Sequence, residues 1–67
     1  MNRPKKGQLP RPGERIKLTF APGYSGTALC VFLQDFANGV LVCSAHRSND
    51  LNFYLWGHIE RFEKGSQ

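Results

Sequence analysis

Hydrophobic and polar residues alternate along residues 15–20, where Ile16, Leu18 and Phe20 fall on one side of an extended chain and polar side chains on the other. A period of two is the pattern of a strand that is buried on one face. Residues 27–33 are apolar almost throughout, which predicts a strand covered on both faces, by the core within and by a partner outside. The proline and glycines of residues 21–26 predict a turn between these two strands.

Three more short strands are predicted further along the chain. Residues 40–43 directly follow Asn38 and Gly39, a pair that strongly indicates a β-hairpin and pairs this strand antiparallel with the one before it. A polar turn at 47–50 leads into a strand at 51–56, and Gly57 permits a bend into a last strand at 58–62. No stretch has apolar residues at helical spacing. We therefore predict an all-β fold, a small five-stranded SH3-like barrel that closes on itself.

The strand at residues 51–56 has two different faces. Alternation sends Leu51, Phe53 and Leu55 to one side and Asn52, Tyr54 and Trp56 to the other. The apolar set is the expected core face. The second, amphipathic face is then available as a subunit interface or as a platform on which bases or a flat cofactor ring stack.

The ends of the chain differ in composition from the barrel, which we place at residues 13–63. Residues 1–12 contain three prolines and one sizeable apolar side chain beyond Met1, and we expect a flexible, disordered arm; residues 64–67 form a C-terminal tail. Residues 1–17 hold six of the nine lysines and arginines against one acidic residue, so the net charge of +4 is concentrated at one end. A basic arm beside an aromatic barrel is typical of nucleic-acid-binding proteins, and equally of a solubilising tail. The predicted nucleic-acid contacts are Arg3, Lys5, Lys6, Arg11, Lys17, Tyr54 and Trp56.

The length of 67 residues makes a single domain only marginally stable by itself. With two cysteines and two histidines there is little scope for disulfide or metal support, so we expect a homo-oligomer, either a dimer or a tetramer. The N-terminus has no secretory signal and no apolar run could span a bilayer, which indicates a cytoplasmic protein without a membrane partner. Cys30 and Cys43 are then expected to be buried thiols.

Metal binding and nucleophilic catalysis are both weakly indicated. Cys43 and His46, with Cys30 and His58 elsewhere, lack the paired spacing of a structural zinc site, so we predict no metal. Ser44 or Cys43 near a histidine does not define a nucleophile without further geometry. We expect His46 to be a surface residue at the end of its strand, although at a subunit interface it would make assembly depend on pH.

Several short motifs resemble a known enzyme family. They are Gly13-Glu14-Arg15-Ile16-Lys17, Tyr24-Ser25-Gly26, Gly39, Ala45-His46, Tyr54 and Glu60-Arg61-Phe62. Over residues 13–62 the chain resembles the plasmid-borne type II, trimethoprim-insensitive dihydrofolate reductases. The resemblance implies an SH3-like barrel that assembles as a homotetramer around a pore in which NADPH and dihydrofolate meet.

The same resemblance implies roles for individual residues. Asn52, Phe53 and Tyr54 would line the pore, and Tyr24 and His46 would lie at subunit interfaces. Leu18 stands where the family carries a lysine that attracts the charged ligands. We therefore expect the chain to share the oligomer geometry of this family rather than its reductase chemistry.

A weaker likeness connects the chain to the Sm and Hfq-like RNA-binding proteins. It rests on Gly26, the turn at residues 35–38, and residues 54–59. This resemblance implies a ring that holds single-stranded RNA with Asn38, Phe36 and His58.

The leading hypothesis is a non-enzymatic, oligomeric SH3-like binding module without a cofactor, which contacts RNA or DNA through the basic arm and the aromatic face. One alternative is a divergent type II dihydrofolate reductase that uses NADPH in a symmetric pore built from Asn52, Phe53 and Tyr54. Another is a protein-binding regulatory module, since the fold by itself does not determine function.

Overall fold

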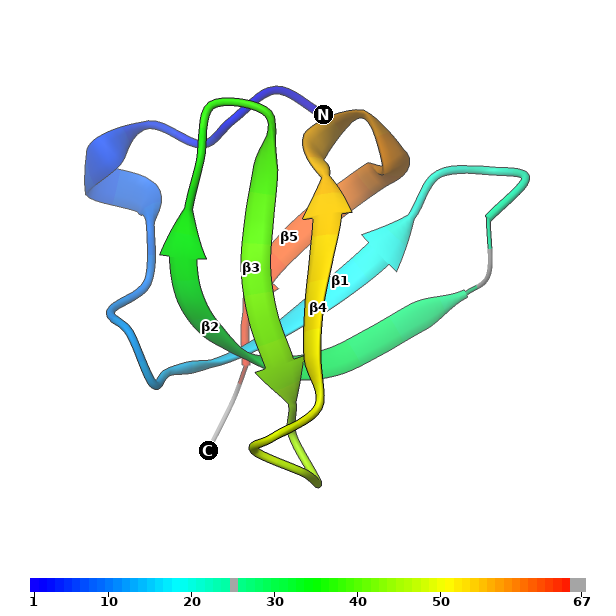
Figure 1. The fold of residues 1–67 in the computed structure, drawn as a ribbon. Helices are drawn as coiled ribbons and strands as arrows, with labels where there is room; N and C mark the ends of the chain where they lie inside the picture. Colours follow the sequence, from blue (N-terminus) through cyan, green and yellow to red (C-terminus); the bar gives the residue numbers. More distant parts are fainter. Residues whose placement is uncertain (25, 66–67) are drawn as a thin grey trace.

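The computed structural model describes residues 1–24 and 26–65, which form one sheet of five antiparallel strands (Figure 1). The strands are β1 (Arg15–Phe20), β2 (Thr27–Asp35), β3 (Gly39–Ser44), β4 (Leu51–Leu55) and β5 (Ile59–Lys64). Two short 3-10 helices complete the chain, η1 (Lys6–Gln8) and η2 (Trp56–His58). The order of strands in the sheet is β4-β3-β2-β1-β5.

The all-β class and the five antiparallel strands confirm the fold predicted from the sequence. The expected closure of the barrel is not met, because the described part of the chain has no ladder between β4 and β5. The sheet curls strongly, with β4 in front of β1 and β5 in Figure 1, and β4 and β5 are its two free edges. We call the region beside the free edge of β4 the open seam. The strand that was expected to start at residue 58 starts at Ile59, since residues 56–58 form η2 instead of a simple bend.

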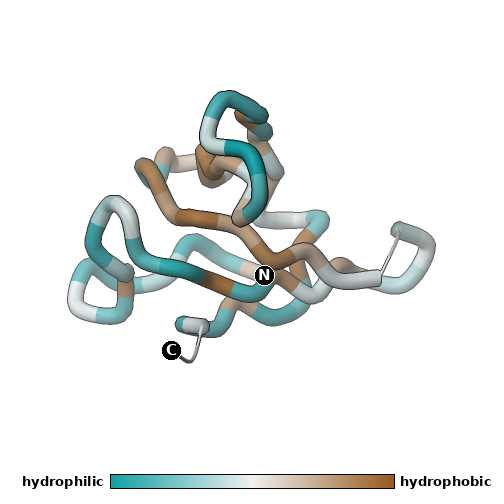
Figure 2. The backbone as a smooth tube through the Cα atoms, turned by 90° about the horizontal axis from the view of Figure 1, so that it is seen from below, coloured by the Kyte–Doolittle hydropathy of each residue, from teal (hydrophilic) through white to brown (hydrophobic). Residues whose placement is uncertain are grey.

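The core lies on the inner face of the curled sheet. Alternation along β1 places Ile16 and Leu18 inside as predicted, and both are almost completely buried. Val40 and Val42 of β3 join them, together with Cys30, Phe32, Trp56 and Ile59. The tube in Figure 2 shows hydrophobic and hydrophilic stretches in turn along the chain. Burial of five or more large side chains at about 1.5–3 kcal/mol each is the main stabilising contribution available to so small a chain.

The predicted hairpin joins β2 and β3, but Asn38 and Gly39 do not have the positive φ angles expected of its turn. Gly39 is already the first residue of β3. A Cβ atom at Gly39 would lie 2.5 Å from Cζ of Phe53 and 2.5 Å from the carbonyl oxygen of Tyr54. Glycine is therefore required here because the Phe53 ring and the backbone of the paired strand β4 fill the space that a Cβ atom would need.

The two faces of β4 are the reverse of the predicted ones. Val40 and Val42 of β3 face the core and pair with Tyr54 and Asn52, so these two residues also face inward. Leu51, Phe53 and Leu55 point outward and retain 58, 46 and 41% of their surface. Trp56 is 3% exposed, because the chain leaves the strand at η2 and turns the indole into the core.

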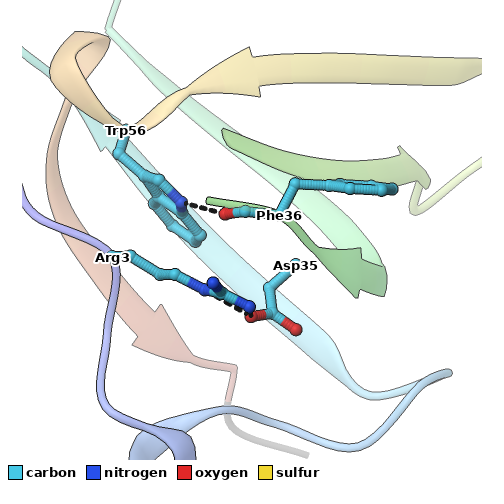
Figure 3. A network of polar contacts seen from close by, with 4 residues as sticks. All are labelled: Arg3, Asp35, Phe36 and Trp56. Atoms are coloured by element: carbon cyan, nitrogen blue, oxygen red, sulfur yellow. Dashed lines mark hydrogen bonds and ion pairs between the residues drawn. The ribbon is translucent and has the colours of Figure 1, made fainter. Parts of the chain in front are cut away.

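The N-terminal arm follows a defined path across one end of the sheet. Its terminal amine donates to the carbonyl oxygens of Trp56 and Ile59, at 2.8 and 2.6 Å. Arg3 pairs with Asp35 at the end of β2 (Figure 3). Pro10 is buried. The flexibility of residues 1–12 and their separation from the barrel at residue 12 stay predictions.

Candidate binding surfaces

The outward side of β2, β3 and β4 carries a group of exposed apolar residues, which we call the outer apolar face. It consists of Leu29, Phe36, Leu51, Phe53 and Leu55, each at least 39% exposed. Phe36 and Phe53 meet edge to face at 5.8 Å. Leu41 of β3 is part-buried and lies opposite Phe53 in the register, so the apolar surface continues from β4 to β3 at this point. Large apolar patches of this kind mark interaction sites.

The remaining outward surface, on β1 and β5, is charged. Arg15 and Lys17 alternate along β1 and face outward, and β5 adds Arg61 and Glu63 beside them. The same sheet thus has an uncharged half, on β2 to β4, and a charged half. Within the described residues, Arg3 with Asp35 is the only ion pair, although Glu63 lies opposite Lys17 in the register of β1 and β5.

The open seam beside β4 contains two recesses that share Tyr54. The first, of about 450 Å³, is lined by Phe20, Gly23, Tyr24, Tyr54 and His58. Its walls are two ring pairs: Tyr24 stacks on His58 at 4.3 Å, and Phe20 meets Tyr54 edge to face at 5.0 Å. The second recess, of about 410 Å³, lies between the start of β2 and β4 and includes Asn52 and His46.

The predicted nucleic-acid residues are not all brought together. Trp56 is buried and donates its indole N–H to the carbonyl oxygen of Phe36 at 2.8 Å, so its ring offers no stacking surface (Figure 3). Tyr54 is half-buried against the core. The arm contacts Asp35 at one end of β2, whereas the second recess adjoins Thr27 at the other end of this strand. Lys5, Lys6, Arg11 and Lys17 are exposed, but they do not line the aromatic recess.

The predicted interface and pore residues also separate in the structure. Tyr24 is 51% exposed and lies at the first recess, and the exposed His46 lies at the second. Asn52 and Tyr54 face the seam, whereas Phe53 points to the outer apolar face. The three residues expected to line one reductase pore therefore lie on two faces of one strand.

The two cysteines are buried and free, as predicted. Burial, with a smaller contribution from Cys43, raises the pKa of the Cys30 thiol from 9.0 to about 11. The pKa of Tyr54 is also raised, first by burial and then by Cys30 and Asp50. Both shifts belong to groups that line the second recess.

Within residues 1–24 and 26–65, no group of three or more His, Cys, Asp and Glu side chains could hold a metal ion. No helix in that part of the chain has the length and hydropathy needed to cross a bilayer.

Comparisons with known proteins found no matching family model, no similar curated protein and no similar solved structure.

Sequence reasoning missed the outer apolar face because it assigned Leu51, Phe53 and Leu55 to the core. A usable signal was present, since residues 51–57 contain no charged side chain. An edge strand without charges lacks the usual protection against pairing with another chain. That feature indicates a contact surface even when the inward face is unknown.

Proposed function

We propose that this chain is a non-enzymatic binding module that self-associates through the outer apolar face and binds single-stranded nucleic acid through the basic residues of the arm and β1. The observation that carries the proposal is the division of the outer surface into an uncharged apolar half and a charged half. The apolar half suits contact with protein, and the cations suit contact with phosphates.

Self-association is supported by the size of the chain and by the exposure of its side chains. Leu29 and Leu51 are 61 and 58% exposed, so in an isolated copy their apolar side chains are in contact with water, which is unfavourable. A 67-residue domain gains proportionally more from burying such surface than a larger domain does. Assembly would therefore add to the stability that the small core provides, and both cysteines are free rather than joined in a disulfide.

Contact with nucleic acid is supported by the layout of the cations. Lys5, Lys6, Arg11, Arg15 and Lys17 follow one another from the arm into β1, and all are exposed. Arg3 is excluded from this set because Asp35 holds it. Phosphate contacts of this kind release counterions, so binding weakens as salt rises, with a slope of about −3 if about four cations contact a single strand.

The test is titration of a fluorescent 20-nucleotide single strand, followed by anisotropy over a series of salt concentrations. Substituting glutamine for both Lys5 and Lys6 should reduce the slope by about 1.4, since each phosphate contact contributes about 0.7. The matched control replaces Arg47 and Lys64, which are exposed and lie outside the arm and β1, and removes the same charge. Equal loss in the two double variants, or no binding at low salt, would contradict the nucleic-acid part of the proposal.

A further inference from the structure

The free edge of β4 offers backbone groups as well as apolar side chains. Opposed residues share hydrogen bonds at both ends of the β3–β4 ladder: Ser44 N–H donates to Asp50 at 3.0 Å, and Trp56 N–H donates to Asn38 at 3.1 Å. Hydrogen-bonded pairs alternate with non-bonded ones in an antiparallel ladder. Asn52 and Tyr54 therefore bond to β3, and the N–H and C=O groups of Leu51, Phe53 and Leu55 point away from it.

The sequence of β4 is symmetric in character about its central residue. Reading Leu51 to Leu55 in either direction gives apolar, polar, aromatic, polar, apolar. An antiparallel copy related by a two-fold axis at Phe53 would set Phe53 against itself and Leu51 against Leu55 of the other copy. Both apolar pairs fall on the outer face, and Asn52 meets Tyr54 on the inner face. A strand of this pattern is complementary to itself, which an isologous interface requires.

Charge and space both favour a second copy at this edge. Each copy carries a net charge of +4, so two copies approach best where neither has a charged side chain, and β4 has none. The other edge strand, β5, carries Glu60, Arg61, Glu63 and Lys64. Recesses of about 450 and 410 Å³ adjoin β4 at Tyr54, so the seam has room for an added strand and its inward side chains.

We propose that β4 of one copy pairs with β4 of a second copy, in antiparallel register about a two-fold axis at Phe53, and joins the two five-stranded sheets into one. The pairing forms about six backbone hydrogen bonds between the outward groups of residues 51, 53 and 55. It rests on the self-association in the proposed function and specifies the partner, the strand and the register. It also covers the seam at Tyr54, which leaves the arm and β1 free for phosphates.

Cysteine cross-linking tests the register directly. In a hydrogen-bonded pair the opposed Cα atoms are about 5.5 Å apart, within the range of a disulfide, so Phe53→Cys should link two copies. Two copies of Leu51→Cys would be offset by four residues, about 13 Å, which is too far. The wild-type chain is the control for the native thiols, which are buried and, for Cys30, held protonated by a pKa of about 11.

The expected result is a disulfide-linked dimer of Phe53→Cys that forms at least about tenfold faster than any dimer of Leu51→Cys. A chain with Leu51→Cys and Leu55→Cys together should also link, because these positions oppose each other, and this variant leaves Phe53 intact. Equal linking of the two single variants overturns the register. If wild-type chain sediments as a dimer in that case, only the inferred pairing fails; if it sediments at 7.6 kDa, the self-association in the proposed function fails as well.

Discussion

The two edge strands of the sheet, β4 and β5, differ strongly in their residue composition. β5 is charged at four of its six positions, and its register against β1 shifts between Thr19 and Phe20. β4 has no charged residue, and its three outward side chains are large and apolar. Charges and irregular register are the usual means by which a sheet protects a free edge. This contrast is the reason why we propose a partner at β4 and not at β5.

Making β4 resemble β5 should have the largest effect. Phe53→Lys would place two like charges directly opposite each other at the proposed two-fold axis, where each also loses an apolar contact. We expect the dissociation constant of the dimer to rise about 100-fold or more, measured by sedimentation over a range of protein concentrations. Phe53→Leu, which keeps the apolar character, should remain a dimer. A Phe53→Lys chain that associates as strongly as the wild type would contradict the role of β4.

The close approach of β4 to Gly39 should give the next largest effect. In Gly39→Ala the new methyl group would meet both the Phe53 ring and the backbone of β4, so we expect a loss of about 2–3 kcal/mol in the free energy of unfolding. Gly57→Ala is the control, because an added Cβ there meets nothing within 4 Å and its effect should be within about 0.5 kcal/mol. Denaturant unfolding followed by Trp56 fluorescence measures both. Similar losses in the two variants would refute this account of the hairpin.

Alkaline pH should lower the free energy of unfolding by a smaller amount. The pKa of Cys30 is about 11 in the folded chain, against 9.0 ordinarily, so the folded chain binds this proton more tightly than the unfolded chain. The free energy of unfolding should therefore be constant below about pH 9 and fall by at most about 2 kcal/mol towards pH 11. The raised pKa of Tyr54 acts in the same direction. Cys30→Ala should remove most of the fall, and an unchanged profile in this variant would exclude the thiol as its cause.

The strands and their order along the chain could be predicted because local patterns determine them. Polar and apolar residues alternate cleanly in β1, and turn residues separate β2 from β3. These three strands therefore lie close to the predicted positions. The inward face of β4 could not be predicted. Alternation shows which residues share a face, and the choice between the faces depends on the register with Val40 and Val42.

The candidate surfaces were predicted in part. The cations of the arm and the aromatic character of β4 were recognised from composition, but the burial of Trp56 depends on η2, and the Arg3–Asp35 pair joins residues 32 positions apart. Contacts over such separations leave no local pattern. The absence of charged residues from 51–57 was visible in the sequence. It points to a contact surface at β4, as the exposed edge strand does in the structure.

The most direct test of the account is sedimentation equilibrium of the wild-type chain over a wide concentration range. The account predicts a reversible dimer with twice the 7.6 kDa mass of one chain, shifting to the single-chain mass on dilution. A mass of 7.6 kDa at every concentration would contradict it, because the outer apolar face and the edge of β4 would then remain open to water.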